Sequence, residues 1–170
     1  MQRPNKNDYT ANQELYIKKV EGDNILKVLE DQLNTVPEFL TTIPETKGEY
    51  AYTEGKWTVK QVIEHMIDSE RIFAFRAFCI ARGEKQTLPG FDQDDYVSEA
   101  HSNQRKITEL ANEFRKVREA NLSLFRSFNE EVINKRGNVY NYQITVNAIL
   151  YSIAGHLNHH LEILKERYLE

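Results

Sequence analysis

The sequence predicts an all-α protein built as a four-helix bundle. Apolar residues recur at intervals of three and four along four separate stretches, which is the spacing of helices with one buried face. The 170 residues include only 7 Gly and 4 Pro, so few positions interrupt a helix. We find no convincing strand, repeat or low-complexity run. The length suits a single domain, which we expect to span residues 1–170.

The first predicted helix begins soon after Gly22, where Asp23 is the expected N-cap. Pro37 is expected to bend or interrupt its last turns, because proline lacks the N–H group of a helical hydrogen bond. The apolar positions of this helix are Leu26, Leu29, Leu33, Val36 and Leu40.

The second predicted helix has clear boundaries. Thr58 and Gln61 fit a capping box, in which each side chain pairs with the backbone N–H of the other residue. The helix should continue to about Arg82, because Gly83 is a typical stop. A loop of sequence LPGFDQDDYV, which begins at Leu88, then leads towards the third helix.

The third predicted helix ends at Gly137, after Lys135 and Arg136. The fourth should run from about Thr145 to the C-terminus. Four helices with apolar stripes bury one another best as a bundle. The apolar positions are Ile107, Leu110, Phe114, Val117, Leu124 and Phe128 in the third helix, and Val146, Ile149, Ile153, Leu157, Leu161 and Leu164 in the fourth.

The composition argues against several classes of protein. A net charge of −4 and no basic cluster give no footprint for a nucleic-acid backbone, so we expect no nucleic-acid partner. No stretch approaches the roughly 20 apolar residues of a membrane span, and the N-terminal MQRPNKNDY lacks the apolar part of a signal peptide. We therefore expect a cytoplasmic protein without a membrane partner. Cys79 is the only cysteine, so a metal ion would need nitrogen and oxygen ligands.

Three histidines are the candidate metal ligands. His65 faces the bundle interior on the second helix, and His156 and His160 face it one turn apart on the fourth. Imidazoles at i and i+4 share a helical face, so a third from a neighbouring helix completes a three-histidine site. His159 falls at the flank of the stripe and is excluded. Such a site leaves coordination positions open, which favours catalysis over a purely structural ion.

The alternative is that these histidines are core residues with hydrogen-bonded ring nitrogens. Two other metal motifs are absent from the sequence. Leu157 takes the place of the glutamate in an HExxH metalloprotease motif, and no Glu-x-x-His pair of a ferritin-like di-iron bundle occurs.

Arg76 lies on a similar face to His65, three turns further along, where an unpaired cation would be costly. It either forms an ion pair with an acidic residue of the loop that follows, or contacts an anionic substrate or cofactor. The loop acids Asp92, Asp94 and Asp95 would supply a base or accept a hydrogen bond from a ligand imidazole, although acidic loops are often merely solvated. No catalytic residue is assigned from the sequence.

Three segments together resemble the DinB-like superfamily of metal-binding four-helix bundles. They are GKWTVKQVIEHMIDSERIFAFRAFCIARG, LPGFDQDDYV and ITVNAILYSIAGHLNHHLEIL. The most specific parts are Trp57, the ERxFxxR stretch from Glu70 to Arg76, and the GHxxHH run from Gly155 to His160. The resemblance covers most of the chain.

The resemblance implies a bundle whose second and third helices run in the same direction, joined by a long crossing loop. It places the metal triad on His65, His156 and His160. Members of the family include a bacillithiol transferase, metal-dependent hydrolases and isomerases. Several relatives carry a glutamate where this chain has Leu157, so a base at that position does not carry over.

The leading hypothesis is an enzyme in which a divalent metal activates a low-molecular-weight thiol for attack on a small electrophilic substrate. A hydrolase that uses metal-bound water is the runner-up, and a metal-stabilised binding module without turnover is a third possibility. Imidazole suits Zn, Ni and Fe alike, so the sequence does not select the metal. The family resemblance also makes a homodimer plausible.

Overall fold

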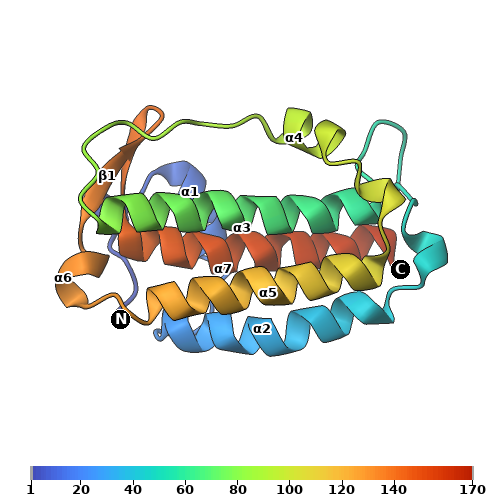
Figure 1. The fold of residues 1–170 in the computed structure, drawn as a ribbon, viewed down its shortest axis with the longest axis horizontal. Helices are drawn as coiled ribbons and strands as arrows, with labels where there is room; N and C mark the ends of the chain where they lie inside the picture. The colour runs from blue at the N-terminus through green and yellow to red at the C-terminus, as the bar shows by residue number, and fades with distance from the viewer. Residues whose placement is uncertain (1, 170) are drawn as a thin grey trace.

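The computed structural model describes residues 2–169, and four long helices dominate it (Figure 1). Two of them run in one direction and the other two in the opposite direction, as the colour gradient along each helix shows. Contacts link the second helix to the fifth, the fifth to the third, the third to the seventh and the seventh to the second, which closes a bundle. The predicted all-α four-helix bundle is confirmed. The long helices are α2 (Ile25–Thr42), α3 (Val59–Ala81), α5 (Ile107–Phe125) and α7 (Val146–Ile163).

Shorter elements connect the long helices or pack against them. They were not predicted, because none is long enough to show a clear periodic pattern. They are α1 (Ala11–Ile17), α4 (Gln93–Glu99), α6 (Glu130–Ile133), strands β1 (Arg136–Val139) and β2 (Tyr142–Thr145), single 3₁₀ turns at Lys6–Asp8, Glu45–Lys47 and Ser102–Gln104, and a π-helical turn at Leu164–Tyr168.

The start of α2 corrects the predicted cap. Asn24, not Asp23, is the N-cap, and its side chain accepts a hydrogen bond from the backbone N–H of Lys27. Pro37 lies inside α2 but does not interrupt it, since the helix continues to Thr42. Proline removes one backbone donor, and the buried apolar face of the helix outweighs that loss here.

The boundaries of α3 were predicted correctly. Thr58 accepts from the backbone N–H of Gln61, and the Gln61 side chain accepts from the N–H of Thr58, which completes the capping box. Arg82 is the C-cap, and Gly83 follows in the left-handed conformation with φ of 86°. Both signals of this helix act within a few residues, so the sequence alone reveals them.

The third predicted helix is wrong at its C-terminal end. α5 stops at Phe125, and the chain then forms α6 and an antiparallel β1–β2 hairpin, which overturns the prediction of no strand. Gly137 does not terminate a helix but pairs with Ile144 in the hairpin. A Cβ atom on Gly137 would lie 2.4 Å from the Ile80 side chain, so glycine lets β1 pack against α3.

The beginning of α7 is as predicted. Thr145 is its N-cap and accepts a hydrogen bond from the N–H of Ala148. The regular helix ends at Ile163, and the π-helical turn carries the chain to Tyr168.

The core consists of two clusters of apolar side chains, one that contains Ala74 and Leu122 and one that contains Ile67 and Phe114, and a buried ion pair lies between them. Arg118 of α5 binds both carboxylate oxygens of Glu70 on α3, at 2.7 and 2.8 Å. It also donates to the side chain of Gln32 on α2, which in turn donates to the backbone of Ala154 on α7. Asn121, which is half-buried, also donates to Glu70. This layer therefore fixes all four long helices relative to one another.

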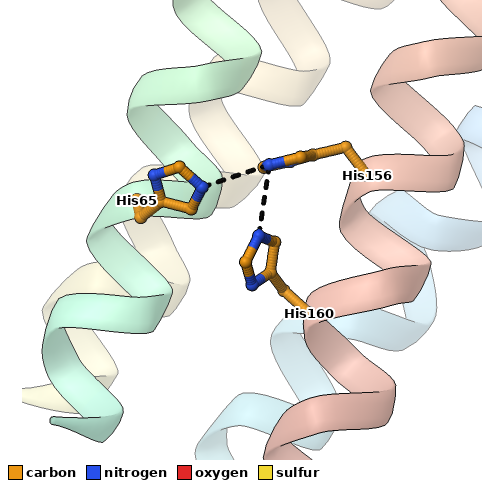
Figure 2. Close-up of side chains that lie close together, drawn as sticks. All are labelled: His65, His156 and His160. Atoms are coloured by element: carbon orange, nitrogen blue, oxygen red, sulfur yellow. Dashed lines mark hydrogen bonds between the residues drawn. The ribbon is translucent and has the colours of Figure 1, made fainter. Parts of the chain in front are cut away.

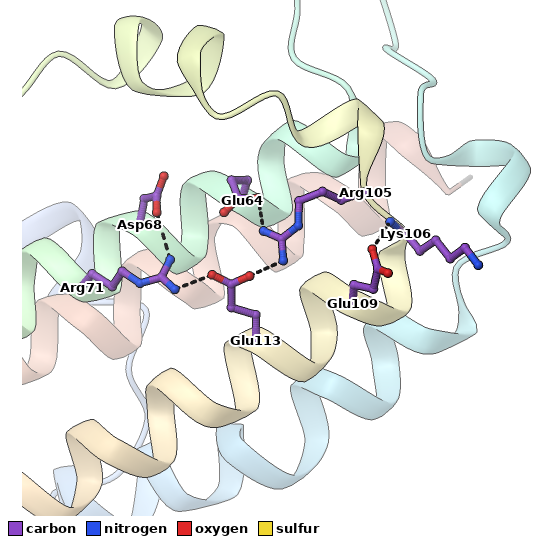
Figure 3. A network of polar contacts seen from close by, with 7 residues as sticks. All are labelled: Glu64, Asp68, Arg71, Arg105, Lys106, Glu109 and Glu113. Carbon is purple, nitrogen blue, oxygen red and sulfur yellow. Dashed lines mark hydrogen bonds and ion pairs between the residues drawn. The ribbon is translucent and has the colours of Figure 1, made fainter.

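The segment between α3 and α5 returns along the length of the bundle, so that α3 and α5 run in the same direction (Figure 1). Arg105, near its end, lies between Glu64 of α3 and Glu113 of α5 and pairs with both (Figure 3). Arg71 adds a bridge from α3 to the same Glu113. These ion pairs anchor the end of the crossing segment against the bundle. Within residues 2–169, no helix is both long and apolar enough to span a membrane.

Candidate metal centre

The three predicted histidines converge on one point (Figure 2). His65 comes from α3, and His156 and His160 come from successive turns of α7. The Nε2 atom of His156 lies 3.1 Å from that of His65 and 3.2 Å from that of His160. One potential ligand atom from each ring lies within 4.8 Å of the others. Helical periodicity predicted that the three rings face the bundle interior, and the structure brings them together there.

The environment of the rings keeps them neutral. Burial lowers the pKa of His65 to about 4, with Asp94 acting weakly in the opposite direction. Burial, followed by repulsion from His65 and His159, lowers the pKa of His160 to about 3. The pKa of His156 is well below its usual range for the same kind of reason, since burial acts first and the neighbouring histidines add to it. Each ring therefore has a nitrogen lone pair available at neutral pH.

The donor set fits a divalent ion. Tetrahedral sites with metal–nitrogen distances of about 2.0–2.1 Å bring the nitrogens to roughly 3.4 Å from one another, close to the 3.1 and 3.2 Å that separate Nε2 of His156 from the nitrogens of the other two rings. Three neutral imidazoles that meet without a carboxylate or thiol among them suit Zn, Ni or Fe. Metal binding by His65, His156 and His160 stays a prediction, and the geometry favours it.

Aromatic and small side chains surround the cluster. The Trp57 ring lies 4.7 Å from that of His65, and Tyr16 and Phe73 contact His156 with ring centroids at 5.1 and 5.6 Å. Ser69 places its hydroxyl 3.5 Å from Nε2 of His65. These rings exclude water from most of the site, which explains the low pKa values of the histidines.

Gly155 allows α1 to close one side of the site. A Cβ atom at this position would lie 1.9 Å from the carbonyl oxygen of Tyr16, so only glycine permits the contact between α1 and α7. Tyr16 then packs edge-on against His156, the residue that follows Gly155. The Gly-His pair of the GHxxHH run thus serves both helix packing and ring placement.

A cavity of about 340 Å³ opens beside His160. Asp94, from the first turn of α4, lies on its wall and accepts a hydrogen bond from Nε1 of Trp57 at 3.0 Å. Among the three loop acids, Asp92 instead caps α4 by accepting from two backbone N–H groups, and Asp95 does not line the cavity. Asp94 is therefore the carboxylate placed to act on a molecule in the cavity.

The sequence did not indicate the remaining walls of this cavity. Tyr52 and Tyr168 lie on it, and Tyr168 donates a hydrogen bond to the backbone carbonyl of Trp57. Tyr168 reaches this position from the π-helical turn after α7, which no spacing in the sequence predicts.

His159 stays outside the cluster and packs against Tyr16. Cys79 is half-buried on α3, and burial raises the pKa of its thiol.

Arg76 corrects one prediction. The expected ion pair with an acid of the crossing loop does not form among residues 2–169, where the guanidinium instead donates to the backbone carbonyl of Pro89 at 2.7 Å. The guanidinium carbon lies 5.8 Å from the ring centroid of Phe73 and 5.7 Å from that of Phe91. Cation–π contacts thus take part of the role that a carboxylate was expected to play.

Comparison with known proteins places this site in a family. The sequence model of the DinB superfamily matches residues 29–164, a range that contains all three histidines. A protein of Oceanobacillus iheyensis, OB0413, is 26% identical over 141 residues, which cover 82% of this chain and 81% of the relative. Its name provisionally assigns it to the metal-dependent hydrolases.

Solved structures share the fold. YfiT from Bacillus subtilis, provisionally described as a metal-dependent hydrolase with an unusual four-helix bundle topology, superposes with a TM-score of 0.72 at 16% identity and covers 97% of this chain and 91% of YfiT. The mycothiol-dependent maleylpyruvate isomerase superposes with a TM-score of 0.61 at 15% identity, over 90% of this chain and 62% of that enzyme. At these identities the likeness concerns the fold alone. The sequence match over most of the chain, together with the bundle topology, shows that this protein belongs to the DinB superfamily.

Proposed function

We propose that this protein is a metal-dependent enzyme that transfers a low-molecular-weight thiol to a small electrophile. The observation that carries the proposal is the meeting of three neutral imidazoles beside a cavity that also presents a carboxylate. His65, His156 and His160 would hold a divalent ion, and the cavity next to His160 would admit the reactants. A bound divalent ion lowers the pKa of a water or thiol ligand and so supplies a nucleophile near neutral pH.

Asp94 has the position of a proton acceptor in this proposal. Its carboxylate shares the cavity with His160, and the hydrogen bond from Trp57 fixes its orientation. The thiol proton passes to Asp94, the sulfur forms a bond to the electrophilic carbon, and the displaced group leaves with the bonding electrons. The aromatic walls at Tyr52, Trp57 and Tyr168 exclude bulk water from the reacting atoms.

The thiol is supported by the mycothiol-dependent isomerase with the same fold. The name of that enzyme states that it requires a low-molecular-weight thiol, and its bundle superposes on 90% of this chain. The cavity volume of about 340 Å³ lies in the range of small-molecule sites, so it accommodates part of a thiol cofactor or its electrophile.

A hydrolase is the second candidate. Its support is the provisional assignment of both OB0413 and YfiT to metal-dependent hydrolases. The same residues would serve this reaction, with Asp94 accepting the proton of a water molecule in place of that of a thiol.

The experiment that tests the proposal uses tag-free protein loaded separately with Zn, Ni or Fe. We would measure consumption of 1-chloro-2,4-dinitrobenzene in the presence of cysteine, glutathione, bacillithiol or mycothiol, and release of nitrophenol from 4-nitrophenyl acetate without a thiol. The expected result is a metal- and thiol-dependent rate that is lost in the His65→Ala variant. Ester hydrolysis alone would support the hydrolase, whereas a metal-loaded protein without either rate would indicate a binding module.

A further inference from the structure

A second cavity, of about 300 Å³, lies between α3 and the crossing segment. Arg76 lines it, although this side chain belongs to a residue that is only 6% exposed. The remaining walls come mainly from apolar groups, including Ile72, Phe75 and Phe91. The cavity therefore combines an apolar lining with a buried cation.

The charge of Arg76 is not neutralised by the described part of the chain. No carboxylate among residues 2–169 forms an ion pair with it, whereas Arg71, the other cation at this cavity, pairs with Asp68 and Glu113. A buried unpaired charge is costly, and proteins rarely retain one without a partner. Burial lowers the pKa of Arg76, but a guanidinium keeps its proton at any physiological pH.

Only part of the hydrogen-bonding capacity of Arg76 is used. One terminal nitrogen donates to the carbonyl of Pro89, while a guanidinium carries five N–H groups. The rings of Phe73 and Phe91 lie near its carbon atom and provide cation–π contacts. The remaining N–H groups are suited to an acceptor that arrives from outside the chain.

We propose that Arg76 and the surrounding cavity bind the carboxylate of a small molecule with an apolar body. A carboxylate is planar and accepts two parallel hydrogen bonds from a guanidinium edge, which is the contact that a ring-flanked arginine still offers. A phosphate dianion would require further donors, and Arg71 is already occupied by acids. The exposed aromatic rings of Phe75 and Tyr96, which are 55% and 49% exposed, provide the apolar contact surface.

The position of this cavity connects it to the metal centre. Phe73 contacts both Arg76 and His156, so one ring lies between the two sites. The segment that contributes Phe91 and Tyr96 to this cavity also contributes Asp94 to the cavity beside His160. If the proposed function holds, the carboxylate belongs to the electrophilic substrate or the thiol, and Arg76 sets its position relative to the metal.

Binding rather than turnover tests this inference, so its outcome does not depend on the proposed reaction. We would titrate the metal-free protein, residues 1–170, with benzoate and 3-phenylpropanoate, and with benzamide as the neutral counterpart, using ligand-observed NMR. The expected result is saturable binding of a carboxylate and at least about tenfold weaker binding of the amide.

Variants separate the two cavities. Arg76→Gln should weaken carboxylate binding at least about tenfold. The matched control is Arg82→Gln. Arg82 also lies over an aromatic ring, that of Phe78, but it does not line the cavity, so this variant should leave binding unchanged. His160→Ala should also retain carboxylate binding, even though it removes a proposed metal ligand. Arg76→Lys is a second variant, which keeps the positive charge but loses the two parallel N–H donors of the guanidinium. It should weaken carboxylate binding less than Arg76→Gln does.

Several results would overturn the inference. Absence of saturable carboxylate binding by folded wild-type protein would do so, as would equal affinity for benzamide. Unchanged carboxylate binding in folded Arg76→Gln would show that the ligand binds elsewhere. If Arg76→Gln fails to fold, unchanged carboxylate binding in Arg76→Lys would lead to the same conclusion. Tighter binding of inorganic phosphate than of either carboxylate would contradict the proposed ligand class.

Discussion

The Nε2 atoms of His65 and His156 lie 3.1 Å apart, although the residues are 91 positions apart in the sequence. Two neutral imidazoles at this distance either share one hydrogen bond or direct their lone pairs at a common cation. His160 presents a third ring nitrogen to the same point, and one hydrogen bond cannot satisfy three rings. The arrangement therefore favours an ion.

Metal content gives the first prediction. We expect tag-free protein to bind about one equivalent of Zn, Ni or Fe, and His160→Ala to reduce this to less than a tenth, because two imidazoles rarely hold such an ion alone. His159→Ala is the matched control, since it removes a neighbouring histidine outside the cluster. Elemental analysis and circular dichroism would check the result. Full metal content in folded His160→Ala would argue against the three-histidine site.

Asp94 gives the second prediction. Asp94→Asn should lower the metal-dependent rate by about a hundredfold or more while leaving metal content unchanged, because the amide keeps the shape but does not accept a proton. Asp95→Asn, one position away and outside the cavity, should retain the rate. Steady-state kinetics and elemental analysis of the same samples would measure both effects. Equal rates for the two variants would remove Asp94 from the mechanism.

The stability of metal-free protein should depend on pH. The pKa of His65 falls from 6.5 to about 4 on folding, so the unfolded chain binds protons first as the pH drops. The stabilisation is fully present above pH 6.5 and is lost as the pH falls towards 4, by on the order of 2 kcal/mol at pH 5 for His65 alone. Thermal unfolding in chelator between pH 7.5 and 5 would show a falling Tm. The slope should be smaller in His65→Ala, and a flat profile would contradict the buried neutral ring.

Gly155→Ala should destabilise the protein. Alanine in a helix normally stabilises relative to glycine, but here its Cβ would lie 1.9 Å from the carbonyl oxygen of Tyr16. We expect a loss of about 2–3 kcal/mol in the free energy of unfolding, measured by urea titration. Gly90→Ala is the control, because the nearest atom to its Cβ would be at 3.4 Å, in the Tyr140 ring. A stabilised Gly155→Ala protein would show that α1 does not pack as described.

The buried pair of Glu70 and Arg118 gives a prediction about coupling. Arg118→Met should cost about 3–5 kcal/mol, because it leaves the Glu70 carboxylate buried without its cation. The double variant Glu70→Leu/Arg118→Met should recover most of this loss, since both charges are then absent. Urea unfolding of the two single variants and the double variant forms the cycle. Additive losses would indicate that the pair does not act as a unit.

Local signals explain which parts of the fold were predictable. The cap at Thr58 and the stop at Gly83 act within a few residues, so the sequence reveals them directly. The end of α5 and the hairpin depend on long-range packing, in which Gly137 lies against Ile80. A glycine read in isolation suggests a helix stop, and only the folded chain shows that it accommodates a neighbouring side chain.

The same distinction applies to the site. Helical periodicity places His65, His156 and His160 on the inward faces of their helices, which is why the sequence could identify them as candidate ligands. The choice of Asp94 among three loop acids depends on the path of the crossing segment and on the hydrogen bond from Trp57, and no spacing encodes either. Of the two partners considered for Arg76, the loop acid was wrong for a related reason, because a backbone carbonyl and two rings replaced it.

The parallel arrangement of α3 and α5 obliges the chain to travel back over the bundle before α5 begins. The imidazoles belong to the long helices, whereas Asp94 and Phe91 belong to this returning stretch. Substitutions in the stretch would therefore alter what the protein recognises without disturbing the three rings. Evolution could in this way change the compounds that enter the cavities while the scaffold that holds the three histidines stays the same.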